Sequence, residues 1–495
     1  MLWSLIHLAT CKWELEQIIK PSLDNYGIFG RSVGVSEDKI VVGASWETTG
    51  SDSRLGALYI FQLDQTTNKY KEVQKLIPYG PEDKSIILNN TGSTCQISRD
   101  GKRIVAGAPY STVKGYEQVG AIVVFDFDES KQLYTQSKII IPVENPTEND
   151  AYQGFGRSLT ITSDGKTIAS GYYNKPNVVK YIDDHGAVFV TTETVDGWTT
   201  PTRIDPPSNN ANIRYKFGSD LQFIDNSHLI VAVDLFDAYF GMGSCYYTRS
   251  GSNDWTLTQQ ILPEGISNGE YNSKPIKSYG SKIGMPNQKT LATMVAYKKD
   301  QNPNGAFFII SFANNKWNTD KFQVIEYPPD VQLSGLAFCG DSTFMTHASN
   351  ITDTRHPNSK TDAILIFRRD SSGNFELSST ETLYPEENPP ELLNYGSDLA
   401  WGHDCNSIVI GGMTKYKHDD SHPEWSDQPS NESRAYVYKL TSPYDPTSNK
   451  AVIIILSLLA CVAVIAVIGV VVYCARKHKG MIKIEKQYGS KINEL

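Results

Sequence analysis

A short segment near the C-terminal end of the chain carries residue types that bind transition metals. Two imidazoles and two carboxylates there could hold a divalent cation: His418, Asp420, His422 and Glu424. Pro423 prevents a regular helix from presenting these side chains on one face. Charged clusters in loops are usually only solvated, so we expect no bound metal. If a metal does bind, these four residues are its candidate ligands.

Local motifs give little support for hydrolysis. The sequence contains no His-Glu-x-x-His metalloprotease signature. A sialidase-like turn would read Ser-x-Asp-x-Gly-x-x-Trp and would need clustered arginines for a carboxylate. Here Ser163-Asp164-Gly165 lacks the tryptophan, and no arginine cluster is visible. We therefore expect a protein that is not an enzyme, with no catalytic residue and no cofactor; a membrane-anchored hydrolase acting on glycans is the alternative.

The elements that must position any site come from an internal repeat with a period near 61 residues. Each unit reads as four short strands, of which the third starts with a small residue and the polar fourth ends at proline. Four-stranded units repeated radially are typical of a β-propeller, whereas a linear β-solenoid would have shorter repeats. The seven units open at Gly30, Gly92, Gly156, Gly218, Gly280, Gly335 and Gly396.

The two ends of the repeat indicate how the ring closes. Residues 13–20 read as a fourth strand that precedes the first unit, and the seventh unit stops after its third strand at Leu440. The N-terminal strand must then complete the last sheet. We expect an all-β, seven-bladed β-propeller closed by the N-terminal strand and followed by one transmembrane helix.

Three stretches of the first unit resemble the FG-GAP repeat, which is the blade unit of the integrin α-chain propeller: Phe29-Gly30-Arg31-Ser32-Val33, Val41-Val42-Gly43-Ala44 and Gly56-Ala57-Leu58-Tyr59-Ile60-Phe61. The resemblance extends over residues 13–440 and implies the propeller fold. Calcium-binding members carry Asp-x-Asp-x-Asp-Gly loops, but the corresponding turns here supply only one or two carboxylates each, so we expect no calcium. Integrin leg domains are missing before the apolar segment, so an integrin proper is not expected.

Residues 451–474 are 24 in number and carry no charge, and at about 1.5 Å each they exceed the roughly 30 Å hydrocarbon layer. The basic residues after them predict a cytosolic tail. We expect a signal peptide at 1–11, the propeller ectodomain at 12–440, a juxtamembrane linker at 441–450, a transmembrane helix at 451–474 and a cytoplasmic tail at 475–495. An uncleaved first strand is the alternative for the N-terminus.

The net charge divides unevenly along this topology. The whole chain has 46 Lys and Arg against 55 Asp and Glu; the tail takes six and two of these, which leaves the rest at 40 − 53 = −13. An acidic body argues against nucleic acid as a partner. We expect a single-pass type I protein of the plasma membrane with its propeller outside the cell, and an internal membrane stays open.

Long loops joining strands 2 to 3 and 4 to 1 would share one face of the propeller, and recognition usually lies on such loops. Aromatic side chains on that face could anchor a ligand, although each could instead be packing. The candidates are Trp46, Tyr110, Tyr172, Tyr173, Tyr239, Phe240, Tyr297, Tyr416 and Trp425.

Modification and redox chemistry add two further expectations. Acceptor sites for N-glycosylation begin at Asn89, Asn350 and Asn431. Four cysteines fall in the predicted ectodomain, and three pairings are possible without one being selected: Cys95, Cys245, Cys339 and Cys405. The sequence thus predicts a surface adhesin or receptor that binds a protein or glycan, or else a non-catalytic subunit that assembles with a partner membrane protein.

Overall fold

The computed structural model describes residues 12–22, 27–48, 54–172, 185–207, 215–235, 243–251, 254–266, 270–284, 289–297, 305–327, 331–340, 342–356, 359–377, 381–386, 393–414 and 433–441. The chain divides into two units, one of residues Trp13–Lys439 and one of Met1–Lys12 with Leu440–Leu495. The predicted signal peptide, transmembrane helix and tail lie outside the described residues. Within the described residues, we find no helix with the length and apolarity to cross a membrane.

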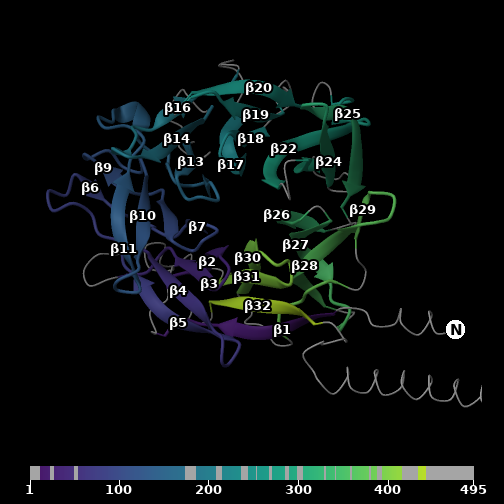
Figure 1. Ribbon diagram of the computed structural model, residues 1–495. Helices are drawn as coiled ribbons and strands as arrows, with labels where there is room; N and C mark the ends of the chain where they lie inside the picture. Colours follow the sequence, from purple (N-terminus) through teal and green to yellow (C-terminus); the bar gives the residue numbers. More distant parts are fainter. Residues whose placement is uncertain are drawn as a thin grey trace, which may run out of the picture. The chain divides into compact units, whose positions relative to one another are not determined.

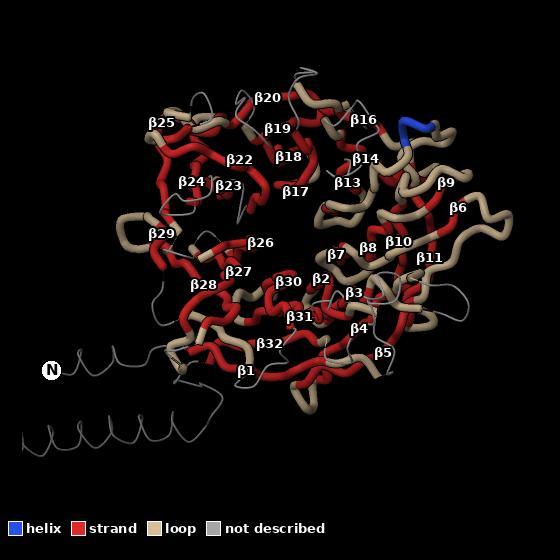
Figure 2. The backbone as a smooth tube through the Cα atoms, turned by 180° about the vertical axis from the view of Figure 1, so that it is seen from behind, coloured by secondary structure: helices blue, strands red, loops and turns tan. Residues whose placement is uncertain are grey.

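The larger unit is a ring of seven antiparallel sheets, as Figures 1 and 2 show from its two sides. The first blade contains β2 (Phe29–Val35), β3 (Lys39–Ala44), β4 (Ala57–Asp64) and β5 (Lys69–Leu76). The second contains β7 (Thr94–Ile97), β8 (Arg103–Ala108), β10 (Ala121–Asp128) and β11 (Leu133–Ile140). The third contains β12 (Leu159–Ile161), β13 (Thr167–Tyr172), β14 (Ala187–Thr194), β15 (Gly197–Trp198) and β16 (Thr202–Ile204).

The remaining blades repeat this order. The fourth contains β17 (Tyr215–Asp225), β18 (His228–Leu235), β19 (Ser244–Arg249) and β20 (Trp255–Ile261). The fifth contains β21 (Glu270–Tyr271), β22 (Lys274–Gly284), β23 (Thr290–Tyr297), β24 (Gly305–Ala313) and β25 (Lys316–Glu326). The sixth contains β26 (Gln332–Cys339), β27 (Thr343–Thr352), β28 (Lys360–Arg369) and β29 (Phe375–Leu377). A ribbon of β6 (Ile86–Ile87) and β9 (Thr112–Val113) and the short helix η1 (Glu148–Asp150) lie in connections.

The seventh blade confirms the predicted closure by the N-terminal strand. Its sheet runs β30 (Leu393–Trp401), β31 (Ser407–Thr414), β32 (Arg434–Thr441) and β1 (Lys12–Ile19), with β1 outermost. Trp13 anchors β1, because its buried indole donates from Nε1 to Glu381 Oε1 (3.2 Å) and its ring contacts Trp401 edge-on at 5.6 Å. First and last strands of the propeller therefore share one sheet.

Close backbone contacts between blades explain the glycines of the repeat. A Cβ on Gly43 of β3 would lie 2.2 Å from the carbonyl oxygen of Gly92, which opens the next blade. Gly107 stands in the same relation to Gly156, at 2.0 Å. Gly171 and Gly411 meet the opening glycines Gly218 and Gly30 in the same way, at 2.2 and 2.3 Å. Among the described residues, six opening glycines also have positive φ, +87° at Gly92, which L residues rarely adopt. The second-strand glycines of the first, second, third and seventh units are therefore required where blades meet.

Aromatic and small side chains fill the space between sheets. The phenylalanine before an opening glycine is buried and contacts an aromatic ring of its own third strand, as Phe29 does with Tyr59 at 5.4 Å. The small residues predicted to begin third strands are all fully buried, as expected: Ala57, Ala121, Ala187, Ser244, Ala306, Ala363 and Ala435. Their small size lets neighbouring sheets approach closely.

Glutamine side chains join the outer strands of neighbouring blades, and we call each such contact a glutamine bridge. Gln74 of β5 donates from Nε2 to the carbonyl oxygen of Tyr134 and accepts from its N–H, both at 2.8 Å. Four such bridges join two outer strands in the described residues: Gln17 with Tyr70, Gln74 with Tyr134, Gln259 with Trp317 and Gln323 with Phe375. Gln136 of β11 makes the same pair of bonds with Tyr79, which lies beyond the end of β5.

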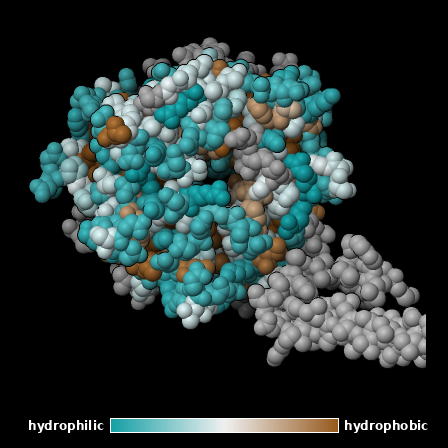
Figure 3. Space-filling model, in the orientation of Figure 1, coloured by the Kyte–Doolittle hydropathy of each residue, from teal (hydrophilic) through white to brown (hydrophobic). Residues whose placement is uncertain are grey.

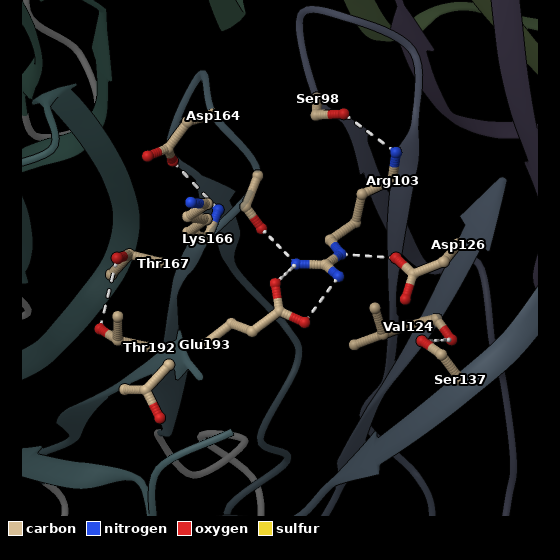
Figure 4. A network of polar contacts seen from close by, with 12 residues as sticks. Ser98, Arg103, Val124, Asp126, Ser137, Asp164, Lys166, Thr167, Thr192 and Glu193 are labelled. Carbon is tan, nitrogen blue, oxygen red and sulfur yellow. Dashed lines mark hydrogen bonds and ion pairs between the residues drawn. The ribbon is translucent and has the colours of Figure 1, made fainter. Parts of the chain in front are cut away.

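An arginine network joins the second and third blades (Figure 4). Arg103 of β8 pairs through Nε with Asp126 (2.6 Å) and through Nη1 with Glu193 (2.6 Å), and Nη1 also donates to Gly165 O (2.9 Å). Burial alone would lower the pKa of Arg103, but the hydrogen bonds to both carboxylates outweigh it and raise this pKa. The network ties blades together and leaves no donor for a ligand on the Nε edge.

The structure resolves the cysteine pairing that the sequence left open. Cys339 at the end of β26 and Cys405, in the turn between β30 and β31, form a disulfide with Cα atoms 5.5 Å apart. Cys95 and Cys245 are buried thiols. The disulfide joins the first-to-second-strand turns of the sixth and seventh blades.

Candidate functional site

Two adjoining cavities open toward the face that carries the connections between strands 2 and 3 and between strands 4 and 1. The first, of about 680 Å³, lies over the first and second blades, and we call it the rim cavity. Trp46 and Arg54 line it from the connection between β3 and β4, Tyr110 from the connection after β8, and Asn89 from the connection after β5. Its volume falls within the usual range for small-molecule sites.

The second cavity, of about 530 Å³, lies deeper along the innermost strands, and we call it the arginine cavity. It shares Arg31 and Tyr110 with the rim cavity, so the two are continuous. Its charged lining consists of four cations and two carboxylates: Arg31, Arg157, Lys216, Lys282, Asp220 and Asp398. These six side chains come from innermost strands or from the residues just before them.

Both carboxylates of the arginine cavity also hold backbone N–H groups. Asp398 accepts from Val33 N and Leu399 N, each at 2.9 Å, and Asp220 accepts from Ile283 N at 3.1 Å. Although Asp398 is partly exposed to the cavity, the burial of its carboxyl raises its pKa. A raised pKa means that this carboxyl keeps its proton to a higher pH than an exposed aspartic acid does.

The arginines at the two cavities are stacked on the predicted aromatic residues. The Arg54 guanidinium lies 4.1 Å from the ring centre of Trp46, and that of Arg157 lies 5.0 Å from the ring centre of Tyr110. Both distances fit cation–π contact. Trp46 and Tyr110 are half-buried, so each retains an exposed part beside a cation.

A third cavity, of about 690 Å³, continues along the ring centre and is lined by all seven innermost strands. It shares Asp220, Lys282 and Asp398 with the arginine cavity and extends to His403 and the disulfide cysteines. Burial, with the nearby charge of Arg99, lowers the pKa of His403. The face of the propeller drawn in Figure 3 is mainly hydrophilic.

The structure brings together two of the predicted aromatic anchors, Trp46 and Tyr110. Tyr172 and Tyr297 are instead in the core, 3% and 4% exposed, and the Tyr172 hydroxyl donates to Asp150 Oδ1 (2.7 Å). Both end second strands, where side chains point between blades. The other anchors lie outside the described residues: Tyr173, Tyr239, Phe240, Tyr416 and Trp425.

The candidate metal ligands His418, Asp420, His422 and Glu424 also lie outside the described residues. Elsewhere, in the part of the chain that the structure describes, no three side chains of metal-binding type gather. Of the glycosylation acceptors, Asn350 is exposed and Asn89 lines the rim cavity, whereas Asn431 is not described.

Sequence reasoning missed the arginines, because they are far apart in the chain. Arg31 and Arg157 stand 126 positions apart but occupy the same place in their repeats, directly after the opening glycine. In a propeller that place faces the ring centre, so aligning the units would have superposed them. The expectation that no arginine cluster exists is therefore wrong in three dimensions.

The sequence also contains two Gly-x-Ser-x-Gly strings, at 30–34 and 265–269, which match the pattern of a nucleophile elbow. An elbow requires a strand-to-helix turn, but the first string lies within β2 and the second connects two strands, β20 and β21. Ser32 is buried and its hydroxyl donates to Gly92 O (2.8 Å), whereas Ser267 lies outside the described residues. The strings therefore give no support for a serine nucleophile.

Comparison with protein families identifies an FG-GAP repeat at residues 23–61. Comparison with curated protein sequences finds no match. A periplasmic gluconolactonase from Pseudomonas aeruginosa is similar in structure, with 11% identity and a TM-score of 0.42, over 71% of this chain and 85% of that one. A putative 6-phosphogluconolactonase from Bacteroides fragilis has 12% identity and a TM-score of 0.43, over 80% and 97%. The β-propeller domain of the Trilobed protease from Pyrococcus furiosus has 9% identity and a TM-score of 0.41, over 88% and 99%.

These likenesses correct the expectation that the chain is not an enzyme. The similar structures are those of lactonases and of a protease domain, so the fold gives no reason to exclude a hydrolase. At identities near one residue in ten, the likeness is one of fold alone. The chain is a seven-bladed β-propeller with an FG-GAP repeat in its first blade.

Proposed function

We propose that this propeller binds an acidic carbohydrate in the continuous rim and arginine cavities. The observation that carries the proposal is the concentration of four cations around one cavity in a chain of net charge −9. Such a reversal of sign attracts an anionic ligand and disfavours a neutral or cationic one. Arginine in particular matches carboxylate and other oxyanion groups through paired N–H donors.

Sugar rings suit the remaining lining of the rim cavity. Trp46 and Tyr110 offer flat faces, while Asn89, Asn90 and Gln118 offer amide donors and acceptors for hydroxyl groups. A purely apolar ligand would leave these groups and the neighbouring guanidinium groups without partners. An acidic carbohydrate satisfies both kinds of lining.

Hydrolysis of the same ligand is the second candidate function. Two carboxylates, Asp220 and Asp398, line the arginine cavity in different environments, and burial raises the pKa of Asp398. A carboxyl that keeps its proton to higher pH can donate it to a leaving glycosidic oxygen, while water adds to the anomeric carbon. Asp398 would be the acid and Asp220 the base.

We further propose that the propeller lies outside the cytosol, joined to the membrane by the segment 451–474, and serves there as a receptor or adhesin. The Cys339–Cys405 disulfide supports an oxidising compartment, and exposed Asn350 could be glycosylated there. A partner membrane subunit would be compatible with the same arrangement.

The test uses the full chain purified in detergent micelles. We expect saturable binding of sialyllactose and oligogalacturonate by calorimetry, at least tenfold tighter than of lactose. Release of free sugar over hours would establish hydrolysis, and loss of that release in Asp398→Asn with retained binding would assign the acid. Equal affinity for charged and neutral sugars, or binding of neither, would refute the proposed function.

A further inference from the structure

We infer that Arg157 is the residue that recognises a carboxylate on the ligand, an inference that rests on the proposed binding function. Arg157 lies two residues before β12 and lines the arginine cavity. Its Nε and Nη2 atoms are buried and have no hydrogen-bond partner in the described part of the chain. Buried guanidinium donors are almost always satisfied, so this side chain lacks an acceptor.

The two atoms without partners define the shape of the missing acceptor. Nε and Nη2 form one edge of the guanidinium plane, along which two N–H bonds point in parallel. A carboxylate presents two coplanar oxygens that match this edge. By contrast, the equivalent edge of Arg103 is already occupied, with Nε bound to Asp126 and Nη2 bound to Glu193.

Two neighbours position the Arg157 guanidinium. Its plane is stacked near Tyr110, with 5.0 Å from the guanidinium carbon to the ring centre. Its Nε lies against Gly154, where a Cβ would be 2.2 Å away, so only glycine leaves room for this arrangement. Gly154 and Tyr110 are therefore positioning residues for a preformed recognition group.

The other cations of the cavity would add charge without the same geometry. Arg31 donates from Nη1 to the sulfur of Met413 (3.6 Å), and Lys216 offers a point charge. They strengthen binding of any anion through charge alone, whereas the Nε–Nη2 edge of Arg157 can pair with two oxygens of one oxyanion. In the proposed acidic carbohydrate, we assign this oxyanion as the carboxylate.

The experiment compares Arg157→Lys with Arg203→Lys in the full chain. Arg203 also stacks on an aromatic ring, at 5.9 Å from Phe189, but is paired with Asp205 and lies outside all three cavities. Calorimetry measures the affinity of each protein for sialyllactose, its methyl ester, sulfated lactose and lactose. We expect Arg157→Lys to weaken the binding of sialyllactose at least tenfold and to leave the affinity for the methyl ester unchanged. Arg203→Lys should change neither affinity.

A second variant separates recognition from folding. Gly154→Ala displaces the guanidinium while keeping its charge, and we expect the same loss of sialyllactose affinity with an unchanged circular dichroism spectrum. If wild-type protein binds sialyllactose and Arg157→Lys binds it equally, the role of Arg157 is refuted while the proposed function stands. If wild-type protein prefers sulfated lactose, the carboxylate assignment is refuted. If it binds no acidic sugar, both proposals fail.

Discussion

The glutamine bridge between the first two blades makes a quantitative prediction. Replacing Gln74 with alanine removes two hydrogen bonds, both 2.8 Å long, from the backbone of Tyr134. Each such bond contributes about 1 kcal/mol net, so Gln74→Ala should lower the free energy of unfolding by about 2 kcal/mol. The freed backbone groups are only partly buried and regain water, so no larger penalty is expected.

Gln74→Glu separates the two bonds chemically. The carboxylate still accepts from the N–H of Tyr134, but its second oxygen faces the carbonyl oxygen that Nε2 had bound. At neutral pH we expect this variant to be at least as unstable as Gln74→Ala. Below the carboxyl pKa the proton restores a donor, so part of the lost stability should return.

Urea unfolding and hydrogen exchange measure the two consequences. A loss of 2 kcal/mol corresponds to about a thirtyfold rise in exchange of the Tyr134 amide if that bridge limits local opening. Gln332→Ala is the matched control, because this exposed glutamine on β26 makes no side-chain hydrogen bond within the described residues. If Gln74→Ala and the control agree within about 0.5 kcal/mol and exchange is unchanged, the bridges do not stabilise the ring.

Three further predictions concern buried positions. Gly43→Ala should unfold the propeller or lower its stability by more than about 3 kcal/mol, because the added Cβ would meet a carbonyl oxygen at 2.2 Å. Gly34→Ala should be tolerated, since its nearest contacts are at 3.5 Å; expression level and melting temperature compare the two variants. Burial raises the pKa of Asp398 above its ordinary 3.8, so the folded state binds this proton more tightly than the unfolded state does. Wild-type protein should therefore lose stability relative to Asp398→Asn as the pH rises above about 4. Urea unfolding measures both proteins, and a stability difference that does not change with pH would contradict the prediction. Burial raises the pKa of Cys95 and of Cys245 to about 12, so neither thiol should react with iodoacetamide at pH 8 until the protein is unfolded, as mass spectrometry can detect.

Much of the propeller could be predicted from the sequence because the same pattern of strands and small residues recurs in seven units. The spacing from Gly30 to Gly396 gives the number of blades, and the unmatched fourth strand at residues 13–20 gives the closure that β1 and β32 realise. Small residues such as Ala57 mark where sheets pack, since only they fit. These features depend on strand periodicity and residue size, which a linear sequence records directly.

The candidate site could be predicted only in part. Trp46 and Tyr110 were identified because aromatic residues in long connections are conspicuous, but the same criterion selected Tyr172 and Tyr297, which are core. Whether an aromatic ring at the end of a second strand points outward or between blades depends on twist and neighbouring sheets. No local pattern records that choice.

The sequence by itself determined the architecture, since a period near 61 residues, an opening glycine in each unit and a fourth strand placed before the first unit together indicate one closed ring. Only the tertiary structure decided the site. Arg31 and Arg157 are 126 positions apart and become neighbours of one cavity because radial symmetry carries equivalent positions to a common centre. The same closure brings Cys339 next to Cys405. The sequence alone allowed three pairings of the four cysteines and favoured none of them. A site at the ring centre is built from side chains of different blades. The distances between these side chains depend on how the ring closes, and the spacing of residues within one blade does not determine them.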